Sequence, residues 1–120
     1  MKIAFSTSGE SLEAPLDSRF GRAPNFLVYD LDSGQARVVD NGVSRASSQG
    51  AGIQAADSVA RAGAGAVVTG HCGPKAFQVL HAAGIKVFSC HAATVGEALD
   101  QYRSGALVEQ SGADVAGPHA

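Results

Sequence analysis

The stretch Ala66-Val-Val-Thr-Gly-His-Cys-Gly-Pro74 decides the fold, because it joins a short buried strand to the start of a helix. Small and β-branched residues suit a strand covered on both faces, and proline suits the first position of a helix, where no N–H is needed. In open α/β sheets, ligands bind outside the carboxyl ends of strands, where helix N-termini offer unpaired amides. We therefore expect a small anionic or metallic ligand at the turn, which consists of Gly70, His71, Cys72 and Gly73.

Length and composition restrict the class of protein. A chain of 120 residues makes one domain with its own core. A hydrophobic content of 45%, without a long apolar run or a basic leader, predicts a cytoplasmic protein with no membrane span and no signal peptide. The formal charge of −2 offers no general attraction to nucleic acid or to anionic lipid, so we expect neither as a partner. Any anion site must therefore be local.

The order of the remaining patterns predicts an α/β fold. Apolar runs at 2–7, 26–31, 36–40, 66–69 and 85–89 predict five strands, and three helices are expected to end at glycines. The first of these helices is expected to bury Ile53 on its apolar face, and Thr94 with Glu97 predicts a capping box on the last. The predicted sheet is mixed, with its last strands parallel to the first. Three connections should then share one edge: the one after the first strand, the turn at 70–73 and the turn at 90–93.

The connection from Ser8 to Asn25 is long enough to need a function or an anchor. It carries Arg19 and Arg22 on either side of Phe20. One interpretation is a surface loop pinned by Phe20, with the arginines paired to Asp17. The other is a lid that holds cations over the ligand site.

Two adjacent pairs of residues suit soft metals: Cys72 beside His71, and Cys90 beside His91. Thiolate and imidazole bind copper(I), zinc, iron–sulfur or other thiometallate clusters. Neither CxxC nor HxxxH spacing occurs, so two buried thiols with two ordinary loop histidines stay an alternative. A disulfide between the cysteines is a further alternative, if their Cα atoms lie within about 7 Å. No convincing carboxylate group suits two-metal hydrolysis, so we expect no enzyme.

Three motifs in order resemble one known family: Phe20-Gly-Arg-Ala-Pro-Asn-Phe26, Gly50-Ala-Gly-Ile-Gln-Ala55 and Val68-Thr-Gly-His-Cys-Gly-Pro-Lys-Ala-Phe77. They are similar to the nitrogenase iron–molybdenum cofactor accessory family, which includes NifX and the C-terminal part of NifB. The resemblance implies a ribonuclease-H-like, three-layer α/β fold with sheet order 3-2-1-4-5, an antiparallel second strand and three main helices. We expect a single cluster-binding domain at 1–108 and a flexible tail at 109–120.

The resemblance also implies a non-catalytic binding or carrier protein for a metal–sulfur cluster. The chain is most similar to small stand-alone members that carry a molybdenum–copper sulfide cluster, and an iron–molybdenum–sulfur cofactor precursor is the alternative cargo. MinD/Mrp-type ATPases or other cluster-assembly proteins are the expected partners, and the chain is expected to be a monomer or a weak homodimer. A regulatory module for such an ATPase, in cell division or cluster assembly and with a vestigial cluster site, is the alternative function.

Amide donors, cations and a partly apolar pocket would hold an anionic cluster through its sulfides, without donating a ligand. Direct ligation by Cys72, Cys90, His71 or His91 would be an addition. The expected cluster-binding residues are Arg19, Phe20, Arg22, Gly70, His71, Cys72, Gly73, Cys90 and His91.

Overall fold

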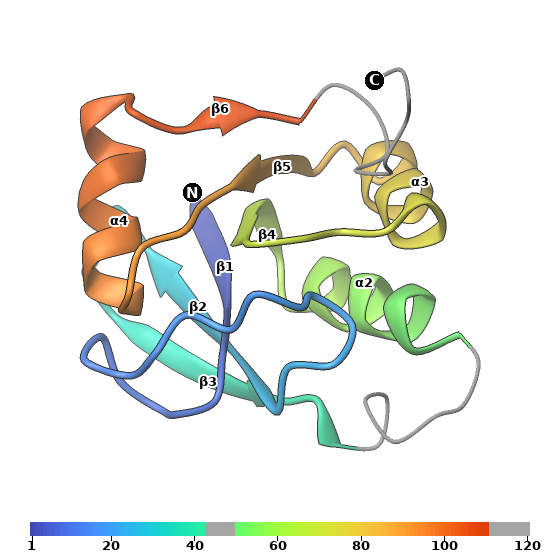
Figure 1. The fold of residues 1–120 in the computed structure, drawn as a ribbon, viewed down its shortest axis with the longest axis horizontal. Helices are drawn as coiled ribbons and strands as arrows, with labels where there is room; N and C mark the ends of the chain where they lie inside the picture. Colours follow the sequence, from blue (N-terminus) through green and yellow to red (C-terminus); the bar gives the residue numbers. More distant parts are fainter. Residues whose placement is uncertain (43–49, 111–120) are drawn as a thin grey trace.

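A computed structural model describes residues 1–42 and 50–110 of the chain, so most of the predicted tail lies outside the described residues. The elements are β1 (Lys2–Thr7), β2 (Asn25–Asp30), β3 (Ala36–Asp40), α2 (Ala51–Arg61), β4 (Ala64–Thr69), α3 (Pro74–Ala82), β5 (Lys86–Ser89), α4 (Val95–Ser104) and β6 (Val108–Glu109) (Figure 1). Within the described parts of the chain, no helix is both long enough and apolar enough to cross a bilayer.

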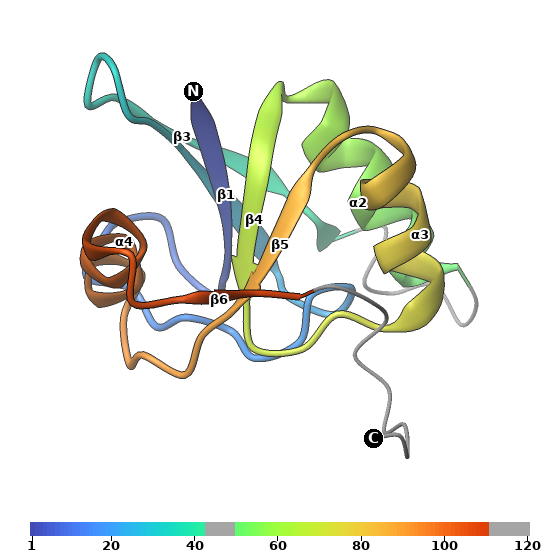
Figure 2. The ribbon, with the colours of Figure 1, turned by 90° about the horizontal axis from the view of Figure 1, so that it is seen from above.

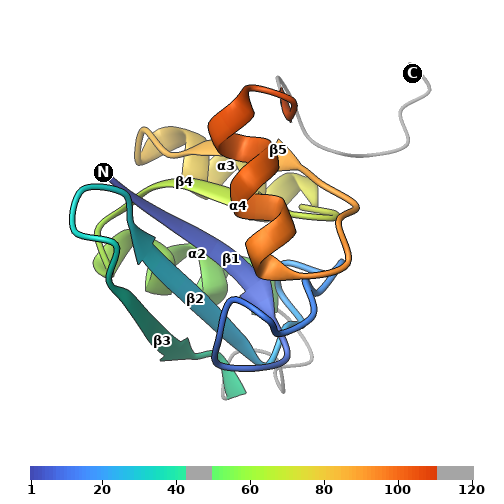
Figure 3. The same ribbon diagram turned by 90° about the vertical axis from the view of Figure 1, so that its left-hand side faces the viewer.

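Among the described residues, the sheet has six strands in the order β3-β2-β1-β4-β5-β6. As predicted, β2 is antiparallel to β1, while β4 is parallel to both β1 and β5. The prediction of five strands omitted β6, which pairs with β5 only through Phe88 opposite Glu109 and Ser89 opposite Val108. A two-residue strand is too short to produce an alternating pattern in sequence. Figure 3 shows β3 at one edge of the sheet and α4 crossing its near face.

Helices cover both faces of the sheet, which makes three layers. In Figure 2, α2 and α3 lie on one side of the strands and α4 lies on the other. Each side has its own core: one contains Phe26, Val59 and Leu80 from the α2/α3 side, and the other contains Phe5 and Leu99 from the α4 side. The mixed α/β class and the three main helices are therefore confirmed for the described residues, and the ribonuclease-H-like label stays a prediction.

Helix ends follow the signals in the sequence. Pro74 occupies the first turn of α3, and the Thr94 hydroxyl accepts a hydrogen bond from the Glu97 amide at the start of α4. Gly84 follows α3 with a φ of 77°, a conformation that side-chain-bearing residues rarely adopt. These caps set the directions in which the chain leaves and re-enters the edge of the sheet.

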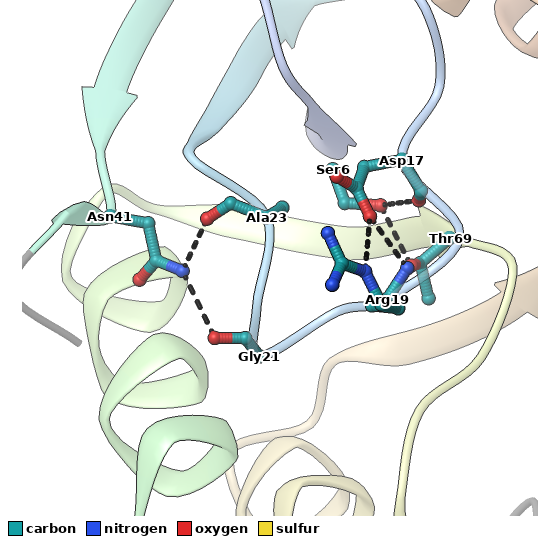
Figure 4. Close-up of polar contacts among 7 residues, drawn as sticks. All are labelled: Ser6, Asp17, Arg19, Gly21, Ala23, Asn41 and Thr69. Carbon is teal, nitrogen blue, oxygen red and sulfur yellow. Dashed lines mark hydrogen bonds and ion pairs between the residues drawn. The ribbon is translucent and has the colours of Figure 1, made fainter. Parts of the chain in front are cut away.

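The long connection after β1 is anchored by buried hydroxyl groups, as Figure 4 shows. The Ser6 hydroxyl donates to the Asp17 carbonyl oxygen at 2.6 Å and is hydrogen-bonded to the Thr69 hydroxyl at 2.7 Å. The Asp17 amide in turn donates to the Ser6 carbonyl at 2.8 Å, and the Thr7 hydroxyl donates to the Pro15 carbonyl at 2.7 Å. Hydroxyls at the ends of β1 and β4 thus satisfy the backbone of the connection and fix its path.

We expect Ser6→Ala to lower the free energy of unfolding by about 1–3 kcal/mol, because it leaves the buried Thr69 hydroxyl and the Asp17 carbonyl without this partner. Urea unfolding measures the change. Ser104→Ala removes a hydroxyl that bonds only at the exposed end of α4, to the Gln101 carbonyl, and should cost less than about 0.5 kcal/mol. Equal stability of the two variants would contradict the anchoring role of Ser6.

Candidate functional site

The three predicted connections do meet at one edge of the sheet. The Phe20 amide donates to the His71 carbonyl oxygen at 3.0 Å, which joins the long connection to the β4–α3 turn. The Leu16 amide donates to the Ala93 carbonyl oxygen at 3.1 Å, which joins the same connection to the β5–α4 turn. The long connection therefore runs along the carboxyl ends of the parallel strands and contacts both neighbouring turns.

A pocket of about 260 Å³ lies on the α2/α3 side of this edge, between the first turns of α2 and α3. Its volume is several times the roughly 30 Å³ of one water molecule, and smaller than the roughly 300–1,000 Å³ typical of drug-sized ligands. It is therefore large enough for a small polyatomic group. Its lining residues are Phe20, Gly21, Gly50, Gly52, Ile53, Gly73, Pro74, Lys75 and Ala76.

The electrostatics of this pocket favour an anion. The N-cap residues of both helices are glycines, Gly50 and Gly73, which have no side chain to cap the first amides. Neither first turn contains an acidic residue in the sequence, and Lys75 adds a positive charge at the pocket wall. Two helix N-termini, each with a partial positive charge, therefore open onto the same small volume.

Backbone contacts between glycines hold the walls of the pocket together. A Cβ on Gly21 would lie 2.9 Å from both the Cα and the N of Gly52, so the long connection rests directly on the first turn of α2. A Cβ on Gly52 would lie 3.1 Å from the Cβ of Ala76, so α2 rests closely on α3. By contrast, a Cβ on Gly73 would meet no described atom within 4 Å, so this position has room for a side chain.

The pocket also has apolar walls. Phe20 is 2% exposed and packs on Phe26 with ring centroids 5.0 Å apart, which fixes its ring at the wall. Ile53 was predicted to be buried, and this prediction was wrong: the side chain is 40% exposed. The buried face of α2 consists of Ala51, Ala55, Ala56 and Val59, so Ile53 falls at its edge and lines the pocket.

Of the residues predicted from sequence, Phe20 and Gly73 line this pocket. Arg19 is 59% exposed, and its Nε lies 3.4 Å from the Asp17 carboxylate. This agrees with the first interpretation of the connection, in which it is a surface loop with an arginine paired to Asp17. Arg22 is also exposed. The buried anchors of the connection and its pairing with the His71 carbonyl favour a fixed loop over a lid.

The two cysteines lie on opposite faces of the sheet. Cys72 is fully buried in the core under α2 and α3, and Cys90, 3% exposed, belongs to the core under α4. They do not form a disulfide. His71 and His91 are both exposed. Within residues 1–42 and 50–110, no group of three or more His, Cys, Asp or Glu side chains is placed to hold a metal ion, so ligation by these residues stays a prediction.

Cys90 lies beside a different hollow from the pocket described above. This hollow, of about 470 Å³, is lined by Cys90, His91 and Gln101 among others. The Cys90 thiol donates to the Gln101 side-chain oxygen at 3.4 Å and accepts from the Ala92 amide at 3.4 Å. These contacts tie the β5–α4 turn to α4, and they direct the thiol away from the pocket at the helix N-termini.

The sequence prediction missed several pocket residues. Gly50 and Gly52 had a detectable signal, since a glycine-rich segment preceding a helix is typical of anion-binding turns, but the phosphate-loop spacings are absent. Lys75 had a weaker sequence signal, because it is a cation in the first turn of the helix that follows the buried strand. The pocket forms only because α2 and α3 lie side by side. The sequence pattern of each helix does not predict that arrangement.

The fold and the pocket together define a small three-layer α/β domain with a largely apolar pocket at the edge of its sheet, at which two helix N-termini and Lys75 meet. Residues 1–105 match the family described as dinitrogenase iron-molybdenum cofactor. The chain belongs to this family, and the resemblance seen in its three motifs is confirmed.

Solved structures support the same assignment. The apo form of the orange protein from Desulfovibrio gigas is 43% identical, with a TM-score of 0.92 over 95% of this chain and 96% of that one. The NMR structure of a candidate NifB protein from Thermotoga is 33% identical, with a TM-score of 0.84 over 97% and 98% of the two chains. A relative is also found by sequence alone. An uncharacterised protein of Methanocaldococcus jannaschii is 26% identical over 110 residues, which is 89% of each chain.

We expect Gly21→Ala to lower the free energy of unfolding by about 1–3 kcal/mol, because the new methyl group would force the connection away from the α2 backbone. Thermal or urea unfolding measures this effect. Gly73→Ser is the matched control, since its Cβ has room and its hydroxyl can cap α3, so stability should not fall. A Gly21→Ala protein as stable as the wild type would show that the Gly21–Gly52 contact is not close in solution.

Proposed function

We propose that this protein is a non-catalytic carrier of an anionic metal–sulfur cluster, which it holds in the pocket between the N-termini of α2 and α3. The observation that carries the proposal is the convergence of two helix N-termini with glycine N-caps, together with Lys75, on one partly apolar pocket. Membership of a cofactor-related family and the similarity to the orange protein support a carrier role. By the resemblance, the cargo is a molybdenum–copper sulfide cluster, with an iron–molybdenum–sulfur precursor as the alternative.

The residues present fit such a cargo. Sulfides at the surface of a cluster are diffuse anions, which accept hydrogen bonds from amides and also tolerate apolar contacts. The N–H groups at the starts of α2 and α3 and the Lys75 ammonium supply the polar contacts, and Phe20 and Ile53 supply the apolar ones. Neither cysteine lines this pocket, so the metals of the cargo would be coordinated by its own sulfides.

Gly73→Asp separates cluster binding from folding. The carboxylate would cap the first amides of α3, which should raise stability by roughly a few tenths of a kcal/mol. The same carboxylate would occupy those amides and repel an anion, so we expect retention of a cluster assembled from tetrathiomolybdate and copper(I) to fall about tenfold. Visible absorbance that co-elutes with the protein in anaerobic gel filtration measures retention.

The charge-matched control is Gln35→Glu, which adds one negative charge at an exposed residue next to β3 and outside the pocket. It should retain the cluster as the wild type does, whereas Lys75→Met should retain less. A wild-type protein that stays colourless after anaerobic loading would overturn the carrier proposal. Full retention by Gly73→Asp would instead place the cluster elsewhere on the molecule.

A partner ATPase of the MinD/Mrp type, in a cytoplasmic setting, is the partner that we infer from the family resemblance. The exposed Ile53 side chain at the mouth of the pocket would then contact the partner during transfer of the cluster. We expect Ile53→Glu to abolish capture of a purified MinD-type ATPase by the immobilised protein without changing its stability. If the cluster-free protein never bound the ATPase, the regulatory alternative would be overturned. If capture were unaffected by Ile53→Glu, Ile53 would not be part of the contact.

A further inference from the structure

Asn41 is a buried polar residue at the end of β3 and does not line the pocket. It is 1% exposed, and three hydrogen bonds connect it to the long connection. Its side-chain amide nitrogen donates to the Ala23 carbonyl at 2.8 Å and to the Gly21 carbonyl at 3.3 Å, as Figure 4 shows. Its backbone amide donates to the Pro24 carbonyl at 2.9 Å.

These bonds fix the wall of the pocket from behind. Gly21 lines the pocket on one side, and its backbone abuts Gly52 on the other, with no room for a Cβ. The other anchor of this segment is the bond from the Phe20 amide to the His71 carbonyl. The segment is therefore held by the β4–α3 turn at Phe20 and by Asn41 at Gly21, Ala23 and Pro24.

The Asn41 carboxamide uses its donors but not its acceptor. Its side-chain oxygen is buried and has no hydrogen-bond partner among the described residues. An unpaired buried acceptor is unfavourable by an amount comparable to the gain from a typical hydrogen bond. This penalty offsets part of the stability that the two donated bonds contribute. Both donor hydrogens point at backbone carbonyls, so the orientation of the amide is set by the bonds themselves.

We propose that Asn41 is a positioning residue for the cluster pocket: it sets the distance between the Phe20–Gly21 wall and the N-terminus of α2. This inference rests on the carrier function proposed above and extends it to a residue that would not touch the cargo. Loss of the two side-chain donors should loosen the wall and weaken cluster binding more than it weakens the fold.

The test compares three variants of the full chain. Asn41→Leu removes both donors at a similar side-chain volume, and Asn41→Asp replaces the amide by acceptors that repel the two carbonyls. Thr94→Ala is the matched control, because it removes the cap of α4 on the other face of the sheet. All three variants are expected to unfold at lower temperature than the wild type, as the loss of a cap or of a buried hydrogen bond predicts.

At comparable loss of thermal stability, we expect Asn41→Leu to lower retention of the tetrathiomolybdate–copper(I) cluster by about fivefold or more, and Asn41→Asp to lower it further. Thr94→Ala should change retention by less than about twofold. In the cluster-free proteins, hydrogen exchange of the Phe20 amide, which donates to the His71 carbonyl, should accelerate in both Asn41 variants and stay unchanged in Thr94→Ala.

The cluster-free measurement keeps this inference separate from the carrier proposal. If the wild type binds no cluster, the carrier function fails, yet faster exchange at the Phe20 amide in the Asn41 variants would still support positioning of this wall. If the wild type binds the cluster but the Asn41 variants retain it no worse than Thr94→Ala, or if exchange at the Phe20 amide is unchanged, the positioning role is overturned.

Discussion

The site depends on the way in which one long connection is bonded to the carboxyl ends of β1 and β4. A segment of this length carries many backbone N–H and C=O groups, and each buried one needs a partner. The buried hydroxyls of Ser6, Thr7 and Thr69 provide partners from the strands themselves. Because these bonds are buried and directional, they allow one path for the chain and leave the segment from Phe20 to Pro24 on the α2/α3 side.

The second constraint is close backbone approach. Gly70 has no room for a Cβ against Ser18, and Gly21 has none against Gly52, so the turns and the start of α2 meet through main-chain atoms. The pocket combines apolar walls with two helix N-termini and the Lys75 cation. The anion binding that we propose would therefore come from the fold rather than from a set of ligating side chains.

Most of the fold could be predicted, because strands and helices of this chain follow local patterns and their ends carry proline, threonine or glycine signals. The shared edge of the three connections followed from the parallel order of β1, β4 and β5. The face of each thiol was harder to predict. Cys90 continues the alternation of β5 and so enters the α4 core, whereas Cys72 lies beyond Gly70, where the chain has already turned toward α3. Ile53 was misplaced because alanines, not the largest apolar residue, form the close contact between α2 and its neighbours.

The placement of the cysteines bears on how a carrier can release its cargo. Thiolates bound directly to the metals of a cluster would form strong coordinate bonds, and such a cluster would leave only by ligand exchange. Amide and ammonium contacts to sulfides are weaker individually and are replaced by water on release. Cys72 and Cys90 are buried in two separate cores on opposite faces of the sheet, and neither lines the pocket between the starts of α2 and α3. A pocket of this kind would combine protection of a sulfide cluster with reversible binding, as the proposed carrier function requires.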